Sequence, residues 1–263
     1  MSRSGDQTFT VHRKLRSELP DVVPPHHVVH ERLIAALERL SAPRVIDAGS
    51  GLGGTTFYLH ARVGGRYDGI TLSPTQRERA EREARRRGAA VADACRFHVR
   101  SYDADVRDLV PEGADLIVAI ESLAHSPDPA KTIAHLARAL RPGGCLAVVD
   151  DMPADELPND DPDFVGFKEG WHAPELTRAR ALEDAFLTAG LLVVHDEDLT
   201  PLVILRGAGS RERRARISGV LKRVLGSTAA GQLMDALHGG MMLERLYARR
   251  LMRYRLLIAR RAQ

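Results

Sequence analysis

One short stretch limits the folds open to this chain. Residues 45–54 read VIDAGSGLGG, an apolar run that reaches Asp47 and is followed by glycines at 49, 51, 53 and 54. A buried strand that turns through glycines into a helix is typical of parallel α/β sheets. Glycine permits positive φ angles and a close approach of the backbone to a ligand. The stretch therefore predicts the first strand of such a sheet and a ligand-binding turn after it.

The chain then alternates strand-like and helix-like segments. Ser73 before Pro74 predicts the start of a charged helix. We expect helices at 28–40, 54–62, 75–88 and 129–140, and strands at 45–48, 67–72, 95–103, 114–122 and 145–151. Alternation of this kind implies right-handed βαβ units and a doubly wound, mostly parallel α/β sheet. Ligands of such a sheet bind at the carboxyl ends of its strands.

Composition excludes several classes of protein. The 263 residues are 44% apolar, and they contain no apolar run near the roughly 18 residues of a membrane span. The polar N-terminus lacks the apolar core of a secretion signal, so a cytoplasmic location is expected. The net charge of +3 comes from interspersed acidic and basic residues. We therefore expect no nucleic acid as a partner.

Asp47 bears on the kind of ligand that the glycine turn binds. The GxGxG spacing alone leaves a dinucleotide-binding turn and a plain tight turn open. A carboxylate directly before the first glycine would repel a pyrophosphate. A ligand with a positively charged group would be favoured at the same place.

Five segments in sequence order resemble the motifs of class I S-adenosylmethionine-dependent methyltransferases. They are VIDAGSGLGG, GITLSPTQ (69–76), SYDAD (101–105), ADLIVAIESLAH (114–125) and LRPGGCLAVVDD (140–151). The variants look most similar to small-molecule methyltransferases that act on sterols, terpenoids and sugar-containing natural products. The resemblance implies a seven-stranded Rossmann-like sheet and S-adenosylmethionine as cofactor. It also implies methyl transfer (EC 2.1.1) to carbon or oxygen of a small apolar metabolite.

The resemblance also implies which residues bind the cofactor. Asp47 and the glycine turn would hold its amino acid end, and Asp103 would contact adenine. Thr71 stands where many relatives carry a ribose-binding acid, so the backbone of 71–72 and Gln76 are expected to hold the ribose. The full expected set is Asp47, Gly49, Ser50, Gly51, Gly53, Thr71, Leu72, Gln76, Asp103, Ala104 and Glu121.

The chain is expected to form one domain in four parts. These are an N-terminal helical segment (1–42), the cofactor-binding core (43–151), a substrate loop and helix (152–189), and C-terminal strands with a helical insertion at 207–245 (190–263). The resemblance would pair strands at 190–200 and 252–261 antiparallel at one edge of the sheet.

The Pro- and Asp-rich stretch 151–172 is expected to be a loop. It contains Phe164, Phe167 and Trp171, followed by His172. We expect these residues to form an apolar lid over the substrate pocket. The alternative is that the rings only pack the loop onto the core.

Methyl transfer requires mainly that donor and acceptor be held about 3 Å apart, away from water. A hydroxyl acceptor needs a base, for which His125 and Asp150 are candidates. An alkene acceptor becomes a carbocation, which aromatic rings could stabilise and Glu169 could deprotonate. His125 could instead be a turn residue, Asp150 a cap and Glu169 a solvated acid.

Three further expectations concern metal, partners and competing functions. Asp150, Asp151 and the acidic run 159–163 could bind a divalent cation, but we expect a flexible acidic loop and no metal. A small-molecule substrate is the expected partner, and the chain could form homo-oligomers. An RNA-modifying methyltransferase and a non-catalytic cofactor-binding domain are the alternatives; the first lacks support because no Asn-Pro-Pro-Tyr motif is present.

Overall fold

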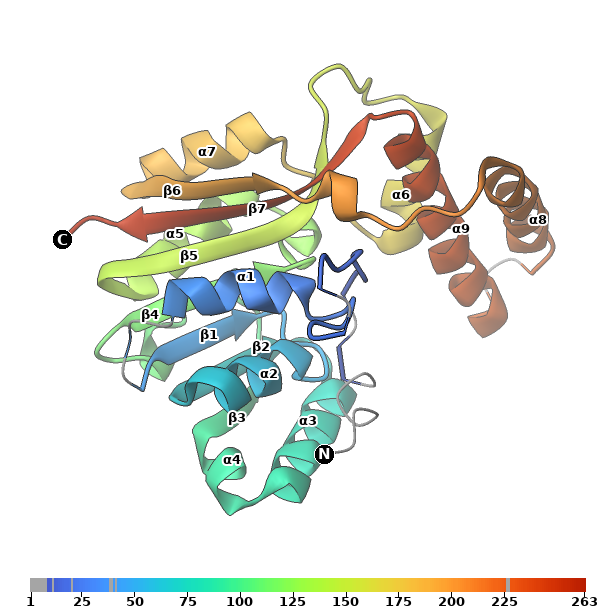
Figure 1. Cartoon of the computed structure of the whole chain (residues 1–263). Coiled ribbons are helices and arrows are strands. Elements are labelled where there is room, and N and C mark those ends of the chain that lie inside the picture. Colours follow the sequence, from blue (N-terminus) through green and yellow to red (C-terminus); the bar gives the residue numbers. More distant parts are fainter. Residues whose placement is uncertain (1–8, 11, 20, 38–39, 41, 226–227) are drawn as a thin grey trace.

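The computed structural model describes residues 9–10, 12–19, 21–37, 40, 42–225 and 228–263. One seven-stranded sheet crosses it, in the order β3-β2-β1-β4-β5-β7-β6 (Figure 1). The strands are β1 (Arg44–Ala48), β2 (Arg66–Thr71), β3 (Cys95–Val99), β4 (Ala114–Ile120), β5 (Leu140–Pro153), β6 (Leu191–Asp198) and β7 (Met252–Arg261). Strands β1 to β5 are parallel, and β7 is antiparallel to both β5 and β6. The expected sheet and its antiparallel edge pair are confirmed.

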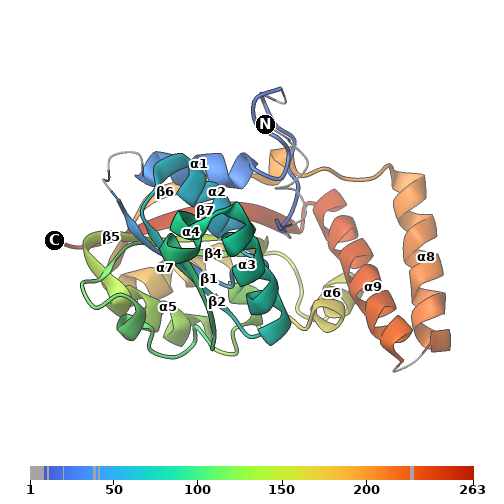
Figure 2. The same ribbon diagram turned by 90° about the horizontal axis from the view of Figure 1, so that it is seen from below.

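Helices cover both faces of the sheet (Figures 1 and 2). The helices α1 (Val28–Leu37), α2 (Gly54–Val63) and α3 (Pro74–Arg87) contribute to one hydrophobic core. The helices α5 (Pro129–Ala139) and α7 (Ala179–Thr188) contribute to a second core on the opposite face. The remaining helices are α4 (Ala89–Ala94), α6 (Pro162–Trp171), α8 (Ala208–Leu225) and α9 (Ala229–Ala248). The last three lie beyond the carboxyl ends of the parallel strands (Figure 1).

The sequence predicted some ends of helices and strands correctly and others incorrectly. The Ser73 hydroxyl accepts a hydrogen bond from the Gln76 amide at 3.3 Å and Pro74 opens α3, so the predicted helix start is confirmed. The third strand ends at Val99 and not near residue 103. The helix expected at the end of the 152–189 part is α7, and the fifth strand, expected at 145–151, runs from Leu140 to Pro153.

The expected loop at 151–172 is wrong over its second half, which is the helix α6. Asp161 caps this helix by accepting the amides of Asp163 and Phe164, and Pro162 occupies the first turn. An Asp-Pro pair is a helix start signal in its own right. Phe164 and Phe167 are buried in the core that α6 shares with α9. These two rings therefore pack α6 against the core, as in the alternative to the apolar lid.

The N-terminal segment contains less helix than expected. Within its described residues, the helix α1 begins only at Val28. Before it, Leu15 forms an antiparallel bridge with Val203, and the Arg16 amide donates to the carbonyl of Leu202 at 2.7 Å. These contacts bring residues 12–19 to the carboxyl ends of the strands (Figure 1). The segment thus covers the edge where a ligand of this fold binds.

Candidate active site

The glycine turn after β1 connects the ends of three strands. The amides of Gly49 and Ser50 both donate to the carbonyl of Ile70 at the end of β2, at 3.0 and 2.8 Å. Gly49 has a φ of +100°, and a Cβ there would lie 2.4 Å from the Cβ of Ser122, directly after β4. Ser122 donates its hydroxyl to the carbonyl of Ala48 at 2.7 Å. Glycine is therefore required at position 49 by both conformation and space.

Asp47 is a buried acid at the end of β1. Its side chain accepts a hydrogen bond from the Thr56 hydroxyl at 2.9 Å. Burial raises the pKa of Asp47 to about 6, although the hydrogen bonds from Thr56 act in the opposite direction. Among the described residues no cationic side chain pairs with Asp47. A positively charged ligand group beside it would therefore stabilise its ionised form.

The end of β2 carries the residues expected to bind a ribose. The Thr71 hydroxyl donates to the side-chain oxygen of Gln76 at 2.6 Å and accepts the Ser73 amide at 3.2 Å. Leu72 is 71% exposed. The structure thus brings Thr71 and Gln76 together beside the glycine turn, and their ribose contact stays a prediction.

Asp103, expected to contact adenine, lies in the loop after β3. Its carboxylate accepts hydrogen bonds from the hydroxyls of Ser101 and Thr132, at 2.9 and 2.6 Å. The next residue, Ala104, is exposed. The carboxylate therefore connects this loop to α5, and its contact with a nucleobase stays a prediction.

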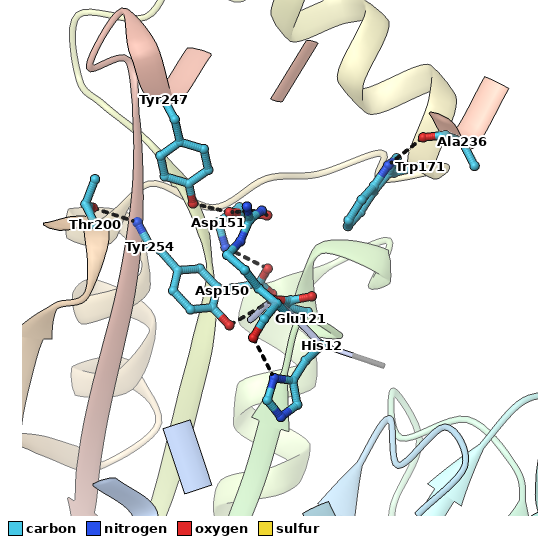
Figure 3. Close-up of polar contacts among 10 residues, drawn as sticks. His12, Glu121, Asp150, Asp151, Trp171, Thr200, Ala236, Tyr247 and Tyr254 are labelled. Atoms are coloured by element: carbon cyan, nitrogen blue, oxygen red, sulfur yellow. Dashed lines mark hydrogen bonds and ion pairs between the residues drawn. The ribbon is translucent and has the colours of Figure 1, made fainter. Parts of the chain in front are cut away.

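A buried cluster of opposite charges lies at the ends of β4 and β5 (Figure 3). We call it the Arg13 cluster; its members are Arg13, Glu121, Asp151, Tyr247 and Tyr254. The Arg13 guanidinium donates to both carboxylate oxygens of Asp151 at 3.1 Å, and Tyr247 donates its hydroxyl to the same group. Glu121 accepts hydrogen bonds from the Arg13 amide and the Tyr254 hydroxyl, each at 2.8 Å. The cluster therefore joins the N-terminal segment to β4, β5, α9 and β7.

The Arg13 cluster provides a strongly favourable setting for a cation. The guanidinium carbon lies 4.9 Å from the centre of the Tyr247 ring and 5.4 Å from that of Tyr254. Burial lowers the pKa of Arg13, but the charges of Asp151 and Glu121 together with the tyrosines outweigh it and raise the pKa. Two carboxylates and two ring faces thus surround a single positive charge.

Asp150 lies next to this cluster, and among the described residues it forms no ion pair. Its carboxylate accepts the amides of Asp151 and Ala124, at 2.9 and 3.2 Å. Burial, with the charges of Asp151 and Glu121, raises the pKa of Asp150 well above its ordinary value. A cavity of about 10 Å³ adjoins Asp150 and Asp151. The hydrogen bonds of Asp150 fit the cap role that was the alternative to catalysis. The catalytic role of Asp150 stays a prediction.

The other candidate bases lie on the surface. His125 Nδ1 lies 3.3 Å from the carbonyl oxygen of His172, and both histidines are exposed. In α6, Phe167 and Trp171 are four residues apart and pack together, with ring centres 5.5 Å apart. Glu169, midway between them, is exposed on the opposite face of the helix. The aromatic setting expected for Glu169 is therefore wrong, while its catalytic role stays a prediction.

Three members of the Arg13 cluster were missed by sequence reasoning. Tyr254 stands opposite Asp151 in the antiparallel register of β5 and β7, so pairing the strands would have revealed it. Tyr247 lies seven residues before Tyr254, at the end of α9. Nothing in the sequence around Arg13 indicates its partner, which is 138 residues away.

The acidic run considered for metal binding forms ion pairs. Asp161 and Asp163 accept hydrogen bonds from the Arg249 guanidinium, at 2.7 and 3.0 Å. In the part of the chain that the structure describes, no group of three His, Cys, Asp or Glu side chains is placed to hold a metal ion. None of the helices in these same ranges has both the length and the apolar character needed to cross a membrane.

Known proteins share both the sequence motifs and the fold. Residues 46–146 match the model of the methyltransferase domain family. Tocopherol O-methyltransferase of Arabidopsis thaliana is 37% identical over 114 residues, which are 43% of this chain and 31% of that protein. A sterol 24-C-methyltransferase of Aspergillus fumigatus is 27% identical over 181 residues, 66% of this chain and 45% of the relative. The chain thus spans less than half the length of these two relatives.

Solved structures agree along nearly the whole chain. Geranyl diphosphate C-methyltransferase from Streptomyces coelicolor has a TM-score of 0.73 and 18% identity, covering 99% of this chain and 94% of that one. The cyclopropane synthase MmaA2 from Mycobacterium tuberculosis has a TM-score of 0.73 and 15% identity, covering 99% and 95%. Residues 46–146 therefore resemble the methyltransferase domain family, and the whole chain shares the fold of these two enzymes.

Proposed function

We propose that this chain transfers a methyl group from S-adenosylmethionine to a small, largely apolar molecule. The single observation that carries the proposal is the buried Asp47 beside the glycine turn, at the ligand-binding edge of the sheet, with no cationic side chain paired to it among the described residues. The relatives that the chain resembles are named for small-molecule acceptors, which favours this function over RNA modification. The cytoplasmic location and the formation of homo-oligomers stay predictions.

The residues at the β1 and β2 ends fit this cofactor. Asp47 would pair with the ammonium of its amino acid end, and the glycines at 49, 51 and 53 would let the backbone approach it. Thr71 and Gln76 would hold the ribose, with Asp103 on the adenine side. When bound, the cofactor supplies an electrophilic methyl group on a sulfonium centre.

The Arg13 cluster would form the acceptor side of the site. It lies after β4 and β5, and Glu121 directly precedes Ser122, whose hydroxyl donates to the carbonyl of Ala48 beside the glycine turn. The carboxylates and tyrosine rings of this cluster would attract positive charge that develops on a nearby acceptor when it is methylated, while the Arg13 guanidinium would oppose it. An alkene carbon gains such charge, whereas a hydroxyl must lose its proton. We therefore favour carbon methylation, with Glu121 or Asp151 receiving the proton that the product loses.

Oxygen methylation is the second candidate, because several relatives are named O-methyltransferases. It would depend on His125 as base. His125 is exposed in this structure, so an acceptor hydroxyl would have to bind near the 123–125 turn.

Product analysis tests the proposal and separates the two candidates. The chain would be incubated with labelled S-adenosylmethionine and three acceptors: geranyl diphosphate, a sterol with a side-chain alkene, and a plant-type phenol. Carbon methylation with Glu121 as base predicts labelled product with an alkene substrate and loss of turnover in Glu121→Gln. Turnover should then be near normal in Glu169→Gln, which replaces the base predicted from the sequence. Labelling of the phenol only, with dependence on His125, would favour oxygen. Strict dependence on Glu169 would show that the acceptor site has been misplaced.

A further inference from the structure

The helices α8 and α9 form a hairpin at one end of the molecule. Figures 1 and 2 show α8 as the outermost element on this side, with α9 between it and α6. Contacts among these helices follow the same order, since α9 packs against both α6 and α8. One long face of α8 is therefore turned away from the rest of the described chain.

The face of α8 that points outward carries apolar side chains. Ile217, Val220 and Leu221 are 51%, 50% and 40% exposed, and their spacing of three and four residues places them in one stripe. The opposite face is the packed one. There Ala215 and Ser218 are buried, and the Ser218 hydroxyl lies 2.9 Å from His238 Nδ1 of α9. The exposed stripe therefore does not belong to the contact between the two helices.

Arginines lie among these apolar residues. The sequence of α8 contains six basic residues and one acidic residue, Glu212. Arg213, Arg214 and Arg216 are exposed, and no ion pair involves them among the residues that the structure describes. Arg213 stands four residues before Ile217 and seven before Val220, so it shares their stripe. Positive charge and branched aliphatic side chains are thus mixed on a single helical face.

The hairpin has two further surface features. Leu233 and Leu237 of α9 are 61% and 46% exposed, and they are also one turn apart. A groove of about 620 Å³ runs between α6, α8 and α9. Met242 and Pro162 line it, and Val220 lines it from the edge of the exposed stripe of α8. The groove connects the outer helix to α6, which packs beside the ends of the strands.

We propose that the α8–α9 hairpin is a docking surface for membranes that contain anionic phospholipids. Ile217, Val220 and Leu221 would enter the headgroup region, while Arg213, Arg214 and Arg216 would contact lipid phosphates. Helices that lie in a membrane interface combine exposed apolar side chains with Lys and Arg, and α8 presents both to solvent. Each basic residue near an anionic surface strengthens binding, and three of them together contribute on the order of 100-fold in affinity. This inference does not depend on which reaction the chain catalyses.

Vesicle sedimentation tests the proposal without any activity measurement. The full chain would be mixed with vesicles of phosphatidylcholine alone and with vesicles that also contain about one third phosphatidylglycerol. We expect binding to the anionic vesicles, at least tenfold weaker binding to the neutral ones, and a strong reduction by salt.

Three sets of substitutions locate the surface. Removing the charges (Arg213→Gln, Arg214→Gln and Arg216→Gln) and removing the apolar stripe (Ile217→Ser, Val220→Ser and Leu221→Ser) should each weaken vesicle binding at least tenfold. A matched control removes three exposed arginines of α3: Arg79→Gln, Arg82→Gln and Arg85→Gln. It should retain most of the binding.

The outcomes separate the proposal from its alternatives. All the substituted side chains are exposed, so unchanged circular dichroism and melting temperature should accompany every variant. No binding to anionic vesicles at low salt, or equal loss in the α3 control, would overturn the proposal. Sedimentation equilibrium would show whether the stripe instead joins two copies of the chain: a dimer that the apolar substitutions dissociate, without vesicle binding, also overturns it.

Discussion

Replacing Arg13 by Met removes one charge from a buried pair while retaining most of the side-chain volume. The guanidinium lies 3.1 Å from both carboxylate oxygens of Asp151, whose side chain is only 3% exposed, against 15% for Arg13. At an effective dielectric constant of about 20, this distance corresponds to a Coulomb energy of about 5 kcal/mol. Loss of one partner of a buried pair typically costs about 3–5 kcal/mol. We expect about 3 kcal/mol for Arg13→Met, because Asp151 keeps the Tyr247 hydrogen bond.

A double-mutant cycle measured by urea unfolding near neutral pH isolates the pair. Asp151→Asn should also destabilise the protein, since it leaves Arg13 without its carboxylate partner. The double variant should be less destabilised than the sum of the two single variants, with a coupling energy of about 2 kcal/mol or more. The hydrogen bond from the backbone amide of residue 13 to Glu121 is retained in every variant, so its contribution cancels in the cycle. A coupling energy below about 0.5 kcal/mol would refute the description of this cluster as a buried ion pair.

Three further predictions follow from the site and its surroundings. Asp47→Asn should stabilise the ligand-free protein at neutral pH by up to about 3 kcal/mol. The reason is that the pKa of Asp47 is raised to about 6 in the folded protein, so wild-type stability falls as the pH rises from 3.8 to about 6. Equal unfolding free energies for both proteins at neutral pH would contradict this. Burial lowers the pKa of His12 and His30 below 6.5, so the stability of the protein should fall as the pH drops below about 6.5. Between pH 7.5 and 5.5, the melting temperature of His12→Asn should fall less than that of the wild type. Gly49→Ala should lower the free energy of unfolding by about 2 kcal/mol or more, since the new Cβ would lie 2.4 Å from a side-chain atom of Ser122. Gly143→Ala, also at positive φ but facing open space, should lower it by only about 1 kcal/mol. Similar losses of stability for both would show that the space around Gly49 is not limiting.

Sequence patterns predicted the sheet because each buried strand and its following turn are local features. The VIDAGSGLGG stretch identifies β1 and its turn, and Ser73-Pro74 identifies the start of α3, without knowledge of any distant contact. The helix α6 was missed because Pro and Asp were interpreted as loop residues, although Asp161-Pro162 is also a helix start. Proline disrupts the interior of a helix but is favoured in its first turn. Its position within a segment therefore determines whether it predicts a loop or a helix start.

The acceptor side of the site could not be predicted for a different reason. Arg13, Asp151, Tyr247 and Tyr254 come together only when the N-terminal segment, β5, α9 and β7 are placed in three dimensions. Glu121 was identified by its motif, but its partners were not. The aromatic residues of the 151–172 stretch were expected to form a lid, but the helix α6 buries Phe164 and Phe167 in the core.

Calorimetric titration with S-adenosylmethionine tests the central claim most directly. The account predicts saturable binding of S-adenosylmethionine and of its demethylated product, no comparable binding of NAD, and affinity reduced at least tenfold in Asp47→Ala, because that change removes the partner of the cofactor ammonium. Tight binding of NAD, or no heat with either the methyl donor or its product, would contradict the claim.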